Sequence, residues 1–295
     1  MHVMDALLEW TAYRSKLCNL GLVARSTVEN QAAIAGKLID ALGSLELSAL
    51  RKSHIELWMG ERLRTCVPVT VRGEMNVLRQ VLRWCVDEAH IVAVPRFPKL
   101  SVPSVESALP SDAAFLWVLA NVPPHHSAAL EFMMLTGLSP HELERVQAGD
   151  MTIDGDDLAS GYRLGIGQRA DFAVKQPSRR RWVPLNGRAR SLWFEAAAGT
   201  GSPKFAPFPK VDAMQKAIRR AHLAAAEQTG QEVPGAAAVT PKLMRKWFAS
   251  KVAGEQPEHV LQRLLGHAPG SPITRRHYVR STEGQVADAV AGIRP

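Results

Sequence analysis

Cysteine and tyrosine are both scarce in this sequence, with three of each in 295 residues. The cysteines, Cys18, Cys66 and Cys85, lie far apart and form no Cys-x-x-Cys pair. An odd, scattered set argues against a disulfide framework or a zinc site, and favours a reducing, cytoplasmic compartment. The chain also lacks an initial basic patch followed by an apolar run, and it has no apolar stretch of membrane-spanning length. We therefore expect neither a signal peptide nor a membrane partner.

What the sequence does contain fits a folded, soluble protein with a basic surface. Its length is sufficient for two ordinary domains, and 46% of its residues are hydrophobic and 22% charged. Lys and Arg number 36 against 28 Asp and Glu, which gives a formal net charge of +8. Such an excess is typical of a protein with a polyanionic partner, although a basic enzyme without one would have the same composition.

Helical patterns fill the first hundred residues. The run 26–29 (Ser-Thr-Val-Glu) fits a capping box that opens a helix ending at Leu42, before Gly43. A second helix, opened by Thr65 or Thr70, carries apolar residues at helical spacing as far as Trp84. Three prolines within residues 94–103 then forbid a regular helix and indicate an extended linker.

The second half mixes helices with short strands. Ser111 should begin one helix and Gly137 should end the next, and a turn is expected at 154–157. Strand-favouring runs follow at 162–166, 172–174 and 182–185. Helical patterns then occupy 211–229, with Gly230 as a stop, and continue from Thr240 to the end.

These patterns predict a mainly α protein with a small β-sheet. Residues 1–98 form a helical domain, 99–106 a linker, and 107–295 a mixed α+β domain.

Basic residues with chemical potential gather near the C-terminus. Thr240 and Pro241 make a good helix start, after which Lys242 and Arg245 are neighbours on one helix face. Two adjacent cations repel one another unless an anion lies between them, although a lone pair of this kind is usually a solvated basic face.

Tyr278 lies among cations, in the run Thr-Arg-Arg-His-Tyr-Val-Arg. Positive charge stabilises a phenolate and so activates tyrosine as a nucleophile, while Arg and His donors stabilise the charge that develops on an attacked phosphate. Taken alone, however, such a tyrosine is more often a half-buried packing residue.

Four short motifs follow one another along the second half of the chain. They are Thr-Gly-Leu-Ser-Pro-His-Glu-Leu at 136–143, Lys-Gln-Pro-Ser-Arg-Arg-Arg-Trp-Val-Pro-Leu at 175–185, Lys-Leu-Met-Arg at 242–245, and Leu-Gly-His at 265–267 followed by Tyr278. Each motif alone is weak, but the four in this order are specific, and they resemble the tyrosine recombinase (phage integrase) family. The helical front half is similar to the core-binding domain of that family.

The resemblance implies roles for matching residues. Tyr278 would attack a scissile phosphate to form a covalent 3′-phosphotyrosine, with Arg245, His267 and Lys242 on the phosphate oxygens. Lys175 would protonate the leaving 5′-oxygen. The phosphotyrosine conserves the energy of the ester bond, so no ATP, metal or other cofactor is implied.

The resemblance also implies a nucleic-acid partner and an assembly. The partner would be double-stranded DNA, bound by a tetrameric synapse at the nucleoid. The expected DNA contacts are Arg179, Arg180, Arg181, Arg275 and Arg276.

Two positions depart from the family pattern. Lys242 stands where the family has His, which is a mild change. Ser139 stands where the family has its first catalytic Arg, so a hydroxyl replaces a bidentate phosphate clamp. Ser139 and Glu142 fit a capping box, which gives Ser139 a structural role and makes Glu142 an orienting residue behind the site.

A substitute for the missing guanidinium could come from Arg145 or Arg169, and the sequence places neither one. The chain is then either a recombinase, with full or reduced activity, or a catalytically impaired DNA-binding regulator or accessory factor. A type IB topoisomerase would share the chemistry but usually lacks this front domain. A zinc metalloenzyme is excluded because His141-Glu142 has no second His at the required spacing.

Overall fold

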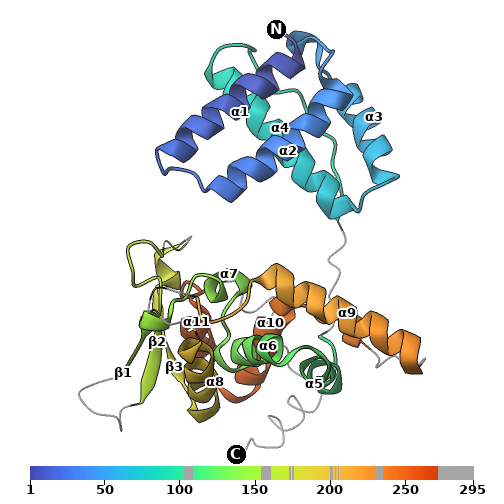
Figure 1. The fold of residues 1–295 in the computed structure, drawn as a ribbon. Coiled ribbons are helices and arrows are strands. Elements are labelled where there is room, and N and C mark those ends of the chain that lie inside the picture. The colour runs from blue at the N-terminus through green and yellow to red at the C-terminus, as the bar shows by residue number, and fades with distance from the viewer. Residues whose placement is uncertain are drawn as a thin grey trace, which may run out of the picture. The chain divides into compact units, whose positions relative to one another are not determined.

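The computed structural model describes residues 1–102, 109–153, 161–172, 174, 176–199, 202, 204, 206–229 and 235–271. The chain divides into two compact units, Met1–Glu106 and Ser107–Pro295 (Figure 1). Among the described helices, none combines the length and the apolar character that crossing a bilayer requires. The turn expected at 154–157 and the helix stop expected at Gly230 lie outside the described residues.

Unit 1 is helical and has its own core. Its elements are α1 (Val3–Asn19), α2 (Arg25–Leu42), the 3-10 turn η1 (Leu47–Ala49), α3 (Lys52–Leu63) and α4 (Pro68–Asp87). The largest side chains that these helices bury completely are Leu7, Leu38, Ile55, Leu78 and Leu82. Helices α1 and α2 pack along one another, and both contact α4.

Two helix starts in unit 1 differ from the sequence prediction. Helix α2 begins at Arg25 with Ala24 as its N-cap, so Ser26 lies inside the first turn and the expected capping box is absent. Helix α4 begins at Pro68 after Val67, rather than at Thr65 or Thr70. Proline at the first helical position has the required φ and gives up only an N–H that would have no helical partner, so it sets this boundary without a side-chain cap.

A buried carboxylate joins three helices of unit 1. Glu74 on α4 is 2% exposed and accepts two hydrogen bonds from Arg62 on α3, at 2.7 and 2.9 Å. Lys37 on α2 approaches the same carboxylate at 3.4 Å. These contacts hold the pKa of Glu74 below its usual value, against the opposing effect of burial.

The segment after α4 is extended, as the prolines predict, but part of it packs on unit 1. Phe97 and Leu100 lie against the core, and the guanidinium of Arg79 stacks 4.4 Å from the centre of the Phe97 ring. A groove of about 560 Å³ runs between this segment and α4, with Arg72 and Lys99 in its walls.

Unit 2 combines helices with one small sheet. Its helices are α5 (Asp112–Asn121), α6 (Pro124–Thr136), α7 (Pro140–Leu143), α8 (Gly187–Ala198), α9 (Val211–Thr229), α10 (Pro241–Glu255) and α11 (Glu258–Leu265). Three 3-10 turns, η2 (Ala148–Asp150), η4 (Pro177–Arg179) and η5 (Ala236–Ala238), connect other elements. Helix α6 lies in the middle of the unit and packs against both α8 and α10 (Figure 1).

The sheet is antiparallel, with strands β1 (Met151–Ile153), β2 (Tyr162–Ile166) and β3 (Arg181–Leu185) in that order. Leu164 of β2 pairs with Met151 on one side and Val183 on the other. Strands β2 and β3 match the predicted runs, and β1 was not predicted. The run at 172–174 was wrongly predicted as a strand, since Phe172 and Val174 lie outside any strand. Phe172 is instead buried in the core of the unit.

Candidate active site

The site begins at the corner between α6 and α7. Helix α6 ends at Gly137, whose φ of +66° is left-handed, and a Cβ there would lie 2.4 Å from the ring of Phe248. Two residues later Ser139 caps α7, with Pro140 at the first helical position. The backbone N–H of Ser139 donates to Glu142 Oε2 at 2.8 Å, and the N–H of Glu142 donates to Ser139 Oγ at 3.4 Å. The predicted capping box is therefore present, and it points the carboxylate of Glu142 inward.

Glu142 is buried between arginines from two other elements. Arg181 at the start of β3 donates to both carboxylate oxygens, at 2.8 and 3.1 Å. Arg245 on α10 donates to Oε2 at 3.1 Å. All three residues are less than 8% exposed. Burial alone would raise the pKa of Glu142, but the two arginines and the Ser139 N–H lower it to about 2. The carboxylate is therefore ionised at neutral pH.

The same arginines also cap the C-terminus of α11. Arg181 Nε donates to the carbonyl of Leu264 at 2.7 Å, and Arg245 donates to that of Leu265 at 2.6 Å. The hydroxyl of Ser178 reaches the carbonyl of Gly266 at 3.4 Å. Side chains thus satisfy three successive carbonyl groups that a helix end would otherwise leave without partners.

This packing places His267 beside the arginines. Gly266 has a φ of +65°, and the N–H of His267 bonds back to the carbonyl of Gln262 at 2.9 Å, as in a Schellman C-cap. Burial is the main cause that lowers the pKa of His267 to about 4, and the charges of Arg245, Arg179 and Arg181 lower it further. The imidazole is therefore neutral at pH 7, with one N–H donor and one acceptor nitrogen.

Arg179 and Arg180 lie at the outer side of this cluster. The guanidinium of Arg179 is 4.0 Å from Glu142 Oε1, and its side chain is 33% exposed. Arg180 is exposed, and its stem lies near Gly167. Within the described residues, three guanidinium groups (Arg179, Arg181 and Arg245) thus face the one carboxylate of Glu142, so positive charge exceeds negative charge in this cluster. Such a cluster is suited to binding an anion.

Several solved structures with the same fold are integrases in complex with DNA. A Tn1549 transposon integrase in complex with transposon right-end DNA superposes with a TM-score of 0.74 at 16% identity, covering 99% of each chain. Lambda integrase bound to DNA gives 0.72 at 14% identity, covering 96% of this chain and 98% of the other. A lambda integrase tetramer bound to a Holliday junction gives 0.71 at 14% identity, covering 94% and 79%.

This chain has the tyrosine recombinase fold of the integrases. The likeness lies in the structure, because no family model and no curated protein matches the sequence.

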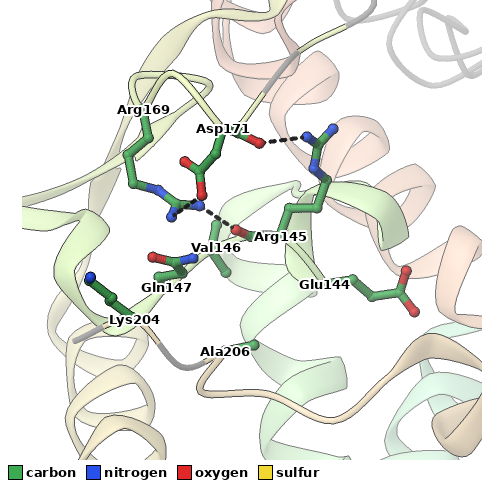
Figure 2. A pocket seen from close by; sticks show the side chains of 8 residues that line it. All are labelled: Glu144, Arg145, Val146, Gln147, Arg169, Asp171, Lys204 and Ala206. Carbon is green, nitrogen blue, oxygen red and sulfur yellow. Dashed lines mark hydrogen bonds and ion pairs between the residues drawn. The ribbon is translucent and has the colours of Figure 1, made fainter. Parts of the chain in front are cut away.

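The guanidinium groups of Arg145 and Arg169 belong to a second cluster, in which both contact Asp171 (Figure 2). Arg169 donates to the carbonyl of Arg145 at 2.8 Å and pairs with Asp150 at 2.7 Å and Asp171 at 3.3 Å. Arg145 in turn donates to the carbonyl of Asp171 at 3.0 Å and stacks over Phe172. Within the described ranges neither guanidinium contacts Ser139 or the carboxylate of Glu142, so the structure does not bring either one into the arginine cluster around Glu142.

Arg181 differs most from its expected role. The sequence placed it with Arg179 and Arg180 as a DNA contact, but the structure buries its guanidinium among protein acceptors. The signal was available, because Arg181, Val183 and Leu185 alternate with exposed neighbours in β3 and therefore share the buried face.

Lys242 is exposed at the start of α10, whereas Arg245, one helical turn later, is buried. Within the described ranges Lys242 makes no hydrogen bond or ion pair. The structure therefore does not bring Lys242 into contact with the arginine cluster.

The remaining predicted residues, Lys175, Arg275, Arg276 and Tyr278, lie outside the described residues. The other two tyrosines are both in aromatic contacts, Tyr13 with Trp84 and Tyr162 with Phe194. The described ranges also contain no group of three His, Cys, Asp or Glu side chains placed to hold a metal ion.

Proposed function

We propose that this protein is a site-specific DNA recombinase that cuts and rejoins DNA through a covalent 3′-phosphotyrosine intermediate. One observation carries the proposal: in an integrase fold, the buried Glu142–Arg181–Arg245 cluster has excess positive charge beside a neutral His267. Guanidinium groups stabilise the charge that develops on a phosphoryl group under attack, and a neutral imidazole beside them can accept or donate a proton.

In the proposed reaction, the phenol oxygen of Tyr278 attacks the scissile phosphorus. A bond forms between that oxygen and phosphorus, and the bond from phosphorus to the 5′-oxygen breaks. The phenol proton passes to a base, for which the acceptor nitrogen of neutral His267 is suited, while Lys175 donates a proton to the leaving 5′-oxygen. The positive charge of Arg245 stabilises the phosphate oxygens. Reversal with a different 5′-hydroxyl rejoins the strand, so no ATP is consumed.

Double-stranded DNA is the proposed partner, and a tetramer of this chain is the proposed working assembly. The formal charge of +8 and the exposed Arg180 support a surface that contacts the phosphate backbone. Lambda integrase forms a tetramer on a Holliday junction, and we propose a similar assembly here, at the nucleoid in the cytoplasm.

A second function, that of a DNA-binding regulator or accessory factor, is favoured by Ser139. Its hydroxyl is occupied as the cap of α7 and replaces a guanidinium, and a lost phosphate donor lowers rates by about 10²–10³. Such a protein would bind DNA tightly but cleave it slowly or not at all.

Covalent trapping distinguishes the two functions. Duplexes with a randomised core and a nick beside the expected scissile phosphate are incubated with the full chain, and DNA that stays attached in detergent is recovered and sequenced. A recombinase should enrich one sequence, and Tyr278→Phe should abolish attachment. Tyr162→Phe removes a phenol hydroxyl from the same unit and should have no effect. Tight binding without any attachment would favour the regulator.

A further inference from the structure

Ser139 and Arg179 both lie beside the carboxylate of Glu142, although they come from different parts of the chain. Ser139 contacts Glu142 Oε2 through its backbone N–H, whereas the guanidinium of Arg179, at the end of η4, lies 4.0 Å from Oε1. We propose that Arg179 supplies the phosphate-clamping guanidinium that this site lacks at position 139. The inference rests on the proposed recombinase function and assigns Arg179 a direct contact with the scissile phosphate.

Arg179 differs from the other two arginines in the hydrogen bonds that its guanidinium donates. Arg181 directs four hydrogen bonds to Glu142, Leu264 and the carbonyl of Arg179. Both terminal nitrogens of Arg245 donate to protein oxygens. The guanidinium of Arg179, in contrast, donates no hydrogen bond to any residue that the structure describes, and 4.0 Å to Glu142 is too long for one. Its planar donor fork is thus available to two phosphate oxygens at once.

The backbone that carries Arg179 is fixed on both sides. Its N–H donates to the carbonyl of Gln176 at 3.0 Å, and its own carbonyl accepts from Arg181 at 3.1 Å. Gly266 packs so closely that a Cβ there would lie 2.9 Å from the Cα of Arg179. The Cα of Arg179 is therefore held at a defined place beside Gly266, from which the side chain extends toward the cluster.

The neighbouring cations do not share these properties. Arg180 is exposed and its stem runs past Gly167, while Arg179 is close enough to His267 to lower the pKa of the imidazole. Arg145 and Arg169 are held in the cluster with Asp171. In the reaction Arg179 transfers no proton; it only offsets charge on the non-bridging oxygens while the tyrosine–phosphorus bond forms and the bond to the 5′-oxygen breaks.

Single-turnover attachment to the trapped duplex tests the assignment. Arg179→Ala should slow attachment by about 10²–10³, and Arg179→Lys, which keeps the charge but loses the fork, by about tenfold. Arg180→Ala removes an equal charge from the adjacent position and should cost less than tenfold. Ser139→Arg in the Arg179→Ala background should recover at least tenfold, because it returns a guanidinium to the vacant position. Thermal unfolding of each variant confirms that it is folded.

A second substrate separates charge stabilisation from a structural role. When a methyl group replaces one non-bridging oxygen of the scissile phosphate, the substrate carries no negative charge to clamp. Arg179→Ala should then react about as fast as the unaltered protein. Equal effects of Arg179→Ala and Arg180→Ala on the phosphate substrate would overturn the assignment while leaving the recombinase function intact.

If the chain attaches to no duplex, the recombinase function is refuted, and binding of inorganic phosphate then tests Arg179 separately. Phosphate titrations followed by the NMR signals of the His267 imidazole should show binding that Arg179→Ala weakens by about tenfold and Arg180→Ala weakens much less. That result would support the clamp in a protein that does not cleave. No phosphate binding, or equal effects of the two variants, would overturn the assignment.

Discussion

Replacing Glu142 by Gln should destabilise unit 2 more than any change in a surface ion pair. The carboxylate accepts hydrogen bonds from Arg181, Arg245 and the Ser139 N–H, and its side chain is 5% exposed. Glutamine has nearly the shape of a protonated glutamate, so the shift in the pKa of Glu142 gives the stabilising free energy that the variant loses. A fall from 4.5 to about 2 corresponds to about 3 kcal/mol in favour of the ionised form. Removing one partner from a buried ion pair costs a similar ~3–5 kcal/mol.

Calorimetric unfolding of the full chain is the assay. For a domain of this size, 3 kcal/mol lowers the melting temperature by about 6–12 °C. Glu131→Gln is the matched control, because Glu131 accepts two hydrogen bonds from Arg188 at the surface of the same unit. That pair should be worth at most about 1 kcal/mol. Equal melting temperatures for the two variants would refute the idea that Glu142 holds the site together.

The pH dependence gives an independent check on Glu142. Its pKa is lower in the folded state than in the unfolded chain, so its contribution is complete above pH 4.5 and is lost as the pH falls toward about 2. The stability difference between the unaltered protein and Glu142→Gln should therefore shrink across that window. A constant difference from pH 7 to pH 2 would mean that the carboxylate charge is not what stabilises the cluster.

Three further predictions follow from the same region. As the pH falls, His267 is protonated at a higher pH in the unfolded chain than in the folded protein, because folding lowers its pKa from 6.5 to about 4. The free energy of unfolding should therefore decrease between pH 6.5 and about 4, and in urea titrations His267→Gln should remove about 1–3 kcal/mol of that decrease. Gly266→Ala should destabilise more than Gly270→Ala, since both have a left-handed φ but only at Gly266 would a Cβ meet backbone, at 2.9 Å; equal melting temperatures would contradict the packing. DNA binding should weaken steeply with salt, Tyr278→Phe should leave it unchanged, and Arg180→Ala should lower the slope of log K against log salt by about one; a flat salt response would exclude phosphate contacts.

Sequence patterns located most elements of the fold because the patterns depend on local physics. Helix α9 has the predicted bounds, Val211–Thr229, since its ends are marked by a change in apolar periodicity. The capping residues of α5 and α7, Ser111 and Ser139, were also predicted correctly. The start of α2 was wrong because Ser26 could cap a helix in isolation, whereas the fold extends the helix to Arg25.

The site was less accessible to sequence reasoning, because its contacts span large separations along the chain. The alternation along β3 places Arg181 on the buried face, but it does not show that Arg181 reaches a glutamate 39 residues earlier and a helix end 83 residues later. The contact of Gly266 with Arg179 is equally non-local, since it depends on how the end of α11 packs against η4. Motif order could therefore indicate which residues share a site, but not which of them face a substrate.

The contacts of Glu142 explain why a serine at position 139 is compatible with an intact site. Glu142 receives the backbone N–H of residue 139, which any residue but proline provides, and its side-chain partners come from β3 and α10. The electrostatic frame of the site therefore does not depend on the side chain at 139, and Ser139 adds only a long cap bond to α7. Replacing an arginine by serine there would change the free energy of unfolding little. The main consequence would be one donor fewer for a bound phosphate. Stability and strand attachment should consequently vary independently at position 139, but together at Glu142.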